Sequence, residues 1–305
     1  MSSPIEHVSD TAFWIAHLRR LESERSDALF RDRFAAKLAG DRGRKIADAM
    51  PTSRIVGWSV ALRTKIIDEF LQSAISAGVD TILNLGAGLD ARPYRMQLPA
   101  ALHWIEADYP AMLEYKAAQL KGETPTCRVE SVKMDLADRD ARRELFKRVD
   151  AQSTAILVLT EGVVPYLENA AVAELADDLH AMEHVRFWVQ EYFSPEASKL
   201  RQRGSIGRSM GNAPFKFVPE DWFEFFKQHG WRTQQMRYLT DESDKVGRPF
   251  PLPLRYRVLA ALARPWMSPE RLAAMRKFTG YALLEPNRLA TADSLHPQRP
   301  SKPAP

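Results

Sequence analysis

The chain has 305 residues and a net charge of +4, and 45% of its residues are hydrophobic, which is enough for the core of one large domain or two small ones. No apolar run reaches the ~18 residues of a membrane span and no signal peptide opens the chain, so we do not expect a membrane as a partner. The basic clusters are interrupted by acids, so we do not expect nucleic acid as a partner either. Because the single cysteine, Cys127, cannot form an internal disulfide and no Cys/His cluster suggests a metal site, a cytoplasmic protein without metal is expected.

The N-terminal part of the chain is predicted to be a helical cap of about 60 residues. Residues 11–38 carry apolar side chains at helical spacing. Residues 39–52, which hold Gly40 and Gly43, are predicted to form a mobile loop. Residues 60–77 are again helical in pattern and lead into the first strand.

The segment 81–90 (TILNLGAGLD) has the pattern of a short apolar strand that breaks into a glycine turn. Gly86 and Gly88 allow a sharp turn and a close approach of the backbone to a ligand, which in an α/β sheet binds over the carboxyl ends of the strands. A cofactor loop and an ordinary turn both fit this pattern. The third glycine of a dinucleotide motif is replaced by Ala91 and Pro93 follows, so we do not expect a helix N-terminus directed at a pyrophosphate.

Three further predicted strands each end in an acid. They are residues 103–108, 129–136 and 155–162, with Asp108, Asp135 and Glu161 at their ends. Asp108 follows Gly86 at the spacing of about 20 residues at which a carboxylate binds a ribose, whereas Glu106 on the same face lies further from the carboxyl end. Unless these acids are solvated turn residues, the rim they form suits a ligand with hydroxyls, an amino group and positive charge, and it repels phosphates. The rim therefore favours S-adenosylmethionine over NAD.

The alternation of strands and helices continues along the chain. Residues 185–193 form a fifth predicted strand, and residues 231–239 and 281–284 form two more, with a helix at 268–279 between them. This order predicts an α/β fold with a mostly parallel seven-stranded sheet and helices on both faces. Residues 287–305 are polar and rich in proline, and we expect them to be disordered.

Residues 194–222 follow the fifth strand and therefore leave the ligand-binding edge of the sheet. They contain glycines, which predict mobility, and Arg201, Arg203 and Arg208, which favour an anionic ligand. We interpret this segment as a lid-like insertion over the substrate; a solvated connector is the alternative. Other candidate walls of the substrate site are Tyr166, Tyr192 and the loop 84–95 with Arg92, Tyr94 and Arg95.

The segments NLGAGLDARPYR, EADYPAMLEYK, KMDLAD and TEGVVPYL, in this order, resemble the leucine carboxyl methyltransferase family and its bacterial branch, which includes polyketide O-methyltransferases. The resemblance covers most of residues 10–285. It implies a class I methyltransferase (Rossmann-like) fold in a single domain over residues 1–286, with S-adenosyl-L-methionine as the methyl donor.

The resemblance also implies a role for individual residues. Arg63 would bind the carboxylate of the donor, and Glu161 would line the donor pocket. The remaining donor contacts would be Gly86, Ala87 and Gly88 for the methionine part, Asp108 for the ribose, and Asp135 and Leu136 for the adenine.

The chemistry of methyl transfer narrows the choice of chemical group that accepts the methyl. A carboxylate is ionised at neutral pH and needs no base, whereas a phenol needs one. Both histidines near the strands, His103 and His184, are predicted at the wrong strand ends. The sequence thus favours an O-methyltransferase for a carboxyl group of a small acidic, polyketide-like metabolite. A phenolic acceptor, a protein C-terminal carboxyl group and a donor-binding protein without catalysis remain open, and no oligomeric state is predicted.

Overall fold

The computed structural model describes residue 5 and residues 7–50, 52–203, 214–253, 255–256, 259, 262 and 266–288. The predicted disordered tail falls outside these residues apart from positions 287 and 288, and Arg208 of the predicted lid also lies outside them. Arg201 and Arg203 belong to a described helix, but their side chains are not described.

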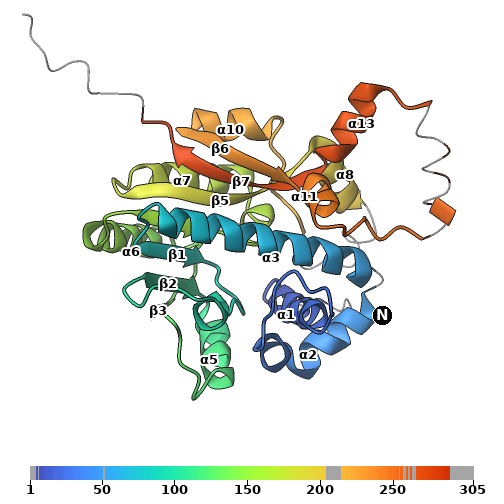
Figure 1. Ribbon diagram of the computed structural model, residues 1–305. Helices are drawn as coiled ribbons and strands as arrows, with labels where there is room; N and C mark the ends of the chain where they lie inside the picture. The colour runs from blue at the N-terminus through green and yellow to red at the C-terminus, as the bar shows by residue number, and fades with distance from the viewer. Residues whose placement is uncertain are drawn as a thin grey trace, which may run out of the picture.

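Seven strands form one sheet in the order β3-β2-β1-β4-β5-β7-β6 (Figure 1). The strands are β1 Thr81–Leu85, β2 His103–Asp108, β3 Arg128–Lys133, β4 Ile156–Leu159, β5 Val185–Phe193, β6 Trp231–Tyr238 and β7 Thr279–Pro286. The first five pair in parallel, and β7 runs antiparallel to both β5 and β6. This confirms the predicted α/β fold with a mostly parallel seven-stranded sheet. The third and fourth predicted strands are shorter than expected, so Asp135 and Glu161 lie in the loops that follow them.

Helices cover both faces of the sheet. They are α1 Asp10–Ser23, α2 Ala35–Ala49, α3 Ser53–Ser76, α4 Arg92–Arg95, α5 Pro110–Gln119, α6 Arg139–Gln152, the 3-10 turn η1 Val164–Tyr166, α7 Asn169–His180, α8 Pro195–Arg203, α10 Trp222–Gln228, α11 Leu239–Lys245 and α13 Pro269–Arg276. No helix among them is both long and apolar enough to cross a membrane.

Buried apolar side chains alternate between the two faces along the central strands. Ile82 packs with residues of α3, whereas its neighbour Leu83 packs with residues of α6 and α7. Leu157 and Val158 of β4 divide in the same way. Because consecutive side chains of a strand point to opposite faces, a strand that is buried on both sides reads as a continuous apolar run, as the sequence of these strands does.

The predicted mobile loop at 39–52 was wrong, because residues 35–49 form α2. Gly40 interrupts the helix with a φ of 53°, so the segment that contains Gly40 and Gly43 is a kinked helix. Gly43 lies against α1, where an added Cβ would overlap the carbonyl oxygen of Phe13. Figure 1 shows α1 and α2 side by side near one end of α3. Glycine here serves close helix packing and does not mark a loop.

Gly43→Ala should destabilise the protein by about 1–3 kcal/mol, because the added methyl group overpacks the contact between α1 and α2. The matched control is Gly57→Ala in α3, whose added Cβ would lie 3.6 Å from Leu18 in ordinary contact. This control should stabilise the protein by roughly 0.5–1 kcal/mol, because alanine is the better helix former. Urea unfolding measures both changes, and equal effects of the two variants would contradict this account of α2.

Candidate functional site

A cavity of about 550 Å³ lies at the carboxyl edge of the parallel strands. The loops after β1, β2, β3 and β4 line one part of it, and residues of α1 and α3 line another. β1 and β4 are neighbours although their connections leave in opposite directions, and ligands of open α/β sheets bind at such a switch point. The cavity therefore lies where the sequence predicted the ligand.

The glycine loop after β1 forms part of the cavity wall through Gly86, Ala87 and Gly88. The φ angles of Gly86 and Gly88 are 69° and 50°, a region that favours glycine. A Cβ at Gly86 would also overlap the side chain of Val163. The turn therefore requires glycine at position 86 for both conformation and space.

Asp108, at the end of β2, also lines the cavity. One carboxylate oxygen accepts a hydrogen bond from the backbone N–H of Gly88 at 2.6 Å, and the other accepts one from Tyr109 at 2.7 Å. Burial raises the pKa of Asp108, although these two hydrogen bonds oppose the shift. Each oxygen keeps a further lone pair for a ligand.

The alternative acid, Glu106, has another partner. Its side chain is 2% exposed and forms an ion pair of 2.7 Å with Lys116, whose side chain is 4% exposed. Glu106 is not among the residues that line the cavity, so of the two acids on β2 only Asp108 can contact a ligand there.

The loop after β3 contributes Asp135 and Leu136 to the cavity. Asp135 is exposed and accepts a hydrogen bond from the backbone N–H of Ala137 at 2.9 Å. Leu136 is half-buried beside the main core. An acidic and an apolar side chain thus stand next to each other at this end of the cavity.

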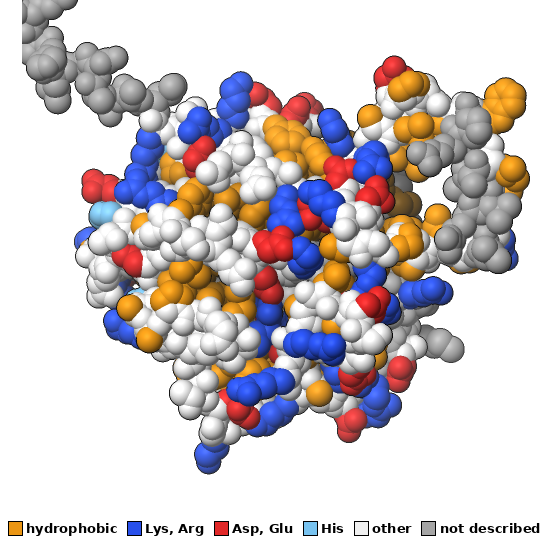
Figure 2. Space-filling model, in the orientation of Figure 1, with side chains coloured by type: hydrophobic (Ala, Val, Ile, Leu, Met, Phe, Trp, Pro, Cys, Tyr) orange, Lys and Arg blue, Asp and Glu red, His pale blue; other side chains and the backbone are white. Residues whose placement is uncertain are grey.

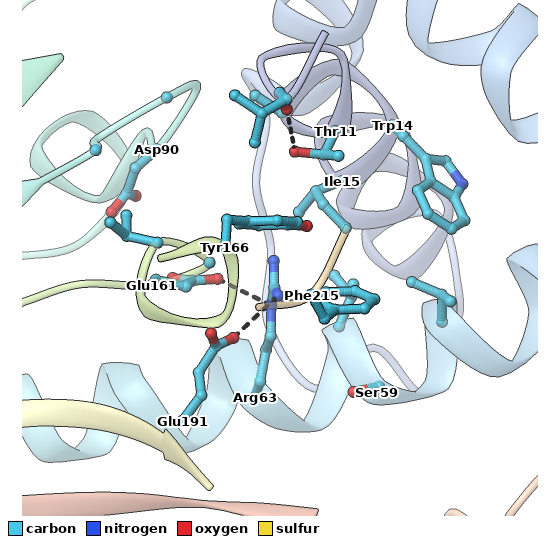
Figure 3. Close-up of a pocket in the computed structure, with 18 of the residues that line it drawn as sticks. Thr11, Trp14, Ile15, Ser59, Arg63, Asp90, Glu161, Tyr166, Glu191 and Phe215 are labelled. Carbon is cyan, nitrogen blue, oxygen red and sulfur yellow. Dashed lines mark hydrogen bonds and ion pairs between the residues drawn. The ribbon is translucent and has the colours of Figure 1, made fainter. Parts of the chain in front are cut away.

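Arg63 of α3 lies between two carboxylates at the centre of the cavity (Figure 3). Its Nε is 2.9 Å from Glu161 and its Nη1 is 3.8 Å from Glu191 of β5. The hydroxyl of Tyr281 in β7 donates a hydrogen bond of 3.1 Å to Glu191. Burial raises the pKa of Glu161, but Arg92 and Arg63 outweigh this effect and lower it. The predicted acidic rim is therefore partly neutralised, because Glu161 faces two guanidinium groups.

Arg92 was predicted to line the cavity, but it does not. It is buried and contacts Asp68 at 2.7 Å, Asp90 at 2.7 Å and Glu161 at 2.8 Å. Arg95 also pairs with Asp68, at 2.7 Å, and the third predicted wall residue, Tyr94, packs on the ring of Phe34. Arg92, Tyr94 and Arg95 therefore lie behind the cavity wall, where they pack against the residues that support it.

After the glycine loop, no helix N-terminus directed at a pyrophosphate was expected. A single helical turn, α4, begins at Arg92, and Pro93 lies in its first turn, where proline is tolerated. None of its residues lines the cavity, so this helix start does not face a ligand there.

The rest of the cavity wall is mainly apolar and aromatic. Tyr166 stacks on Phe215 with ring centroids 5.3 Å apart, and Trp58 meets Phe250 edge-on at 4.9 Å. All four side chains line the cavity, as does Trp14 of α1. Figure 3 shows Tyr166 and Phe215 near the guanidinium of Arg63. The predicted position of Tyr166 in the pocket is thus found, next to aromatic residues that the sequence did not single out.

Tyr192, in contrast, does not line the cavity. It is 8% exposed and packs against Trp222 and Tyr238, and burial raises its pKa to about 12. Its neighbour Glu191 takes the predicted place, because consecutive residues of β5 face opposite sides of the sheet. The signal that could have identified Glu191 is that it is the only acid in β5 and lies two positions before the strand ends.

The predicted lid begins with α8, and the described residues of this segment border the cavity through Leu200 and Phe215. The prediction that Arg201, Arg203 and Arg208 bind an anion is not tested, since it concerns side chains outside the described set.

The described histidines near the strands lie away from the cavity. His103 at the start of β2 pairs with Glu130 at 3.1 Å, and His184 just before β5 pairs with Asp150 at 3.2 Å, so both lie at the end of the sheet opposite the cavity. Within the described part of the chain, no histidine lines the cavity and no group of three or more potential ligands is placed to hold a metal ion. Cys127 is buried, and burial raises the pKa of its thiol to about 11.

The solved structures that resemble this fold include the following two. One is described as a putative methyltransferase from Thermobifida fusca, with a TM-score of 0.52 and 16% identity over 83% of this chain and 92% of that one. The other is a DUF574 family protein from Streptomyces avermitilis, with a TM-score of 0.51 and 14% identity over 89% of this chain and 96% of that one. With the strand order, these neighbours show the class I methyltransferase fold.

Relatives in sequence carry the name "Putative S-adenosyl-L-methionine-dependent methyltransferase". One from Streptomyces avermitilis is 30% identical over 260 residues, which cover 80% of this chain and 89% of the relative. One from Mycobacterium bovis is 36% identical over 194 residues, but this match spans only 62% of that protein and 58% of this chain.

The model of the leucine carboxyl methyltransferase family matches residues 12–180. This segment is more than half of the 305 residues and contains most of α1, all of α3 and the four loops that line the cavity. From the family match and the Streptomyces relative together, we conclude that the chain belongs to the leucine carboxyl methyltransferase family.

Proposed function

We propose that this protein is an S-adenosyl-L-methionine-dependent O-methyltransferase that esterifies a carboxyl group of a small, mainly apolar, polyketide-like acid. The observation that carries the proposal is that the cavity has two walls of different chemical character. One wall is polar and contains the glycine loop, Asp108 and Arg63. The other is built from apolar and aromatic side chains of α1, α3, η1 and the lid segment.

The residues of the polar wall fit the methyl donor. Asp108 would accept hydrogen bonds from the ribose hydroxyls through its remaining lone pairs. Arg63 lines the cavity and would bind the donor's carboxylate through its guanidinium group. When bound, the donor supplies a methyl group already activated on a sulfonium. The protein's remaining task is to hold the acceptor oxygen in line and to exclude water.

The apolar wall supports a carboxylic acid acceptor with a hydrophobic body. Aromatic side chains such as Trp14, Trp58 and Phe215 can surround such a body and exclude water from the reacting atoms. An ionised carboxylate needs no base, in agreement with the absence of histidine among the described lining residues. The second candidate is a phenol, favoured by Glu191, a carboxylate in the cavity that could take the phenolic proton.

The chemistry of the product distinguishes the two candidates. With methyl-labelled donor and a panel of apolar aromatic and aliphatic acids, we expect labelled esters that release methanol in mild alkali. The rate should be nearly constant from about pH 6 to 9, because the acceptor is ionised throughout this range. A labelled product that survives alkali, with a rate that rises tenfold per pH unit, would instead identify a phenol. A large fall in the rate of forming that product in Glu191→Gln would assign Glu191 as the base.

Asp108→Ala should weaken binding of S-adenosylmethionine by ~1–3 kcal/mol, because the ribose hydroxyls lose a charged acceptor. Titration calorimetry measures the change. The control is Asp140→Ala in α6, an exposed acid outside the cavity that should leave donor affinity unchanged. NAD should give no heat with the unaltered protein. Unchanged donor affinity in Asp108→Ala would show that Asp108 has another role.

A further inference from the structure

The helix α3 presents one row of side chains to the cavity. Ile55, Ser59 and Arg63 all line it, and because they are four residues apart they occupy one face of the helix on successive turns. Figure 3 shows Ser59 beside Arg63 along α3. Each step along this row covers about 6 Å of the helix. Ser59 therefore lies between the charged Arg63 and the apolar Ile55.

The indole N–H groups of the apolar wall already have partners within the protein. Nε1 of Trp14 donates a hydrogen bond of 3.2 Å to the hydroxyl of Ser53, and Nε1 of Trp58 donates one of 2.7 Å to the backbone carbonyl of Arg248. Both tryptophans line the cavity, but their polar atoms need nothing from a ligand there. They offer a bound molecule their apolar surface.

The hydroxyl of Ser59 differs, because it makes no hydrogen bond with any residue that the structure describes. A serine inside a helix often bonds the backbone carbonyl four residues earlier, and the Ser59 hydroxyl does not. Unlike the hydroxyl of Thr52, which is buried without a partner, that of Ser59 is accessible. Ser59 thus presents an unused donor and acceptor to the cavity.

An acceptor molecule that fills the apolar part of the cavity excludes water from Ser59. A hydroxyl that loses water and gains no other partner weakens binding. A site built around such a group therefore rejects a ligand without the matching polar atom more strongly than it distinguishes ligands that differ by one methylene. A serine hydroxyl can donate a hydrogen bond to a carbonyl or hydroxyl oxygen, so either group on the acceptor would match Ser59.

We propose that Ser59 selects an acceptor that carries a second polar oxygen, a carbonyl or a hydroxyl, between its reacting carboxyl group and its apolar end. This inference rests on the proposed function and narrows its substrate class. Thr279 is another hydroxyl of the cavity wall without a hydrogen bond to the described residues. It shares a face of β7 with Tyr281, the partner of Glu191, so it belongs to the charged centre of the cavity.

Binding of acids to the protein saturated with S-adenosylhomocysteine tests the selection, because no methyl transfer takes place. Titration calorimetry compares decanoic acid with a series of its oxo derivatives, in which the carbonyl is moved stepwise along the chain. At least one oxo acid should bind about fivefold more tightly than decanoic acid, because it gains a hydrogen bond. In Ser59→Ala this preference should disappear. Decanoic acid should bind to that variant at least as tightly as to the unaltered protein, because no hydroxyl is left without a partner.

The matched control is Ser73→Ala on a second row of α3. Lys65, Glu69 and Ser73 are also four residues apart, but Ser73 is exposed and lies outside the cavity. Lys65 pairs with Glu69 on this outer row. Figure 2 shows acidic and basic side chains next to each other across the middle of the molecule, where α3 runs in Figure 1. Ser73→Ala should keep the preference of the unaltered protein for the oxo acid.

Three results would overturn the role of Ser59. They are equal binding of decanoic acid and every oxo acid to the unaltered protein, a preference that survives in Ser59→Ala, and a preference that is lost only in Thr279→Val. In each case the acids still bind, so the proposed acid acceptor would stand. If no acid of the series bound at all, the proposed acid acceptor would be wrong and the role of Ser59 would fall with it.

Discussion

Arg92→Met should lower the free energy of unfolding by about 3–5 kcal/mol, the largest effect on stability that we expect from a single substitution near the site. The side chain of Arg92 is 3% exposed and contacts three carboxylates, those of Asp68, Asp90 and Glu161. Methionine fills a similar volume but leaves these buried charges without their shared cation. Urea unfolding measures the loss.

The matched control is Arg44→Met on α2. Arg44 is 54% exposed and also faces two carboxylates, Asp41 and Asp48, so its loss should cost less than about 1 kcal/mol. In a second test, Arg92→Met/Asp90→Asn should recover part of the stability, because one buried charge is removed along with the cation. If Arg92→Met were as stable as Arg44→Met, the ion pairs of Arg92 with the three carboxylates would not stabilise the protein.

Arg63→Lys should weaken binding of S-adenosylmethionine by roughly 1.5–3 kcal/mol while leaving the affinity for adenosine unchanged. A guanidinium can hold a carboxylate through two parallel hydrogen bonds, and an ammonium group cannot. Lysine keeps the positive charge between Glu161 and Glu191, so the charge balance of the cavity is preserved. Titration calorimetry with the two ligands separates the carboxylate contact from the rest of the donor site.

Lys65→Arg on the same helix is the control, because Lys65 pairs only with Glu69 among the ion pairs of the described residues and does not line the cavity. This variant should bind both ligands normally. Equal weakening for both ligands in Arg63→Lys would mean that Arg63 acts by holding Glu161 and Glu191 in place, and its assignment to the donor's carboxylate would be abandoned.

The fold and the location of the site could be predicted because their signals are local. The apolar runs of β1, β2 and β4, the glycines at 86 and 88, and the acids that follow the strands can each be recognised in a few consecutive residues. Parallel strands bring their carboxyl ends to one edge, so acids that follow successive strands in the sequence are expected at the same cavity. Asp108, Asp135 and Glu161 all line it.

Local signals misled where a residue type serves two purposes. Gly40 and Gly43 resemble a loop, yet one forms a kink and the other allows α2 to approach α1 closely. Whether glycine marks a loop or a contact depends on the partner helix, which a single segment does not contain.

By itself, then, the sequence determined the order of strands and helices, the glycine turn and the acids at the strand ends, since periodicity and turn chemistry depend on near neighbours in the chain. Only the tertiary structure decided which charges meet and which side chains face the cavity. Arg92 and Arg63 are both arginines near predicted motifs, but one is buried behind the site and the other lies within it. Glu191 rather than Tyr192 reaches the cavity, because a one-residue step along β5 reverses the face of the sheet. These choices depend on contacts between residues far apart in the chain, such as Asp68 with Arg92 and Glu191 with Tyr281, and no local pattern encodes them.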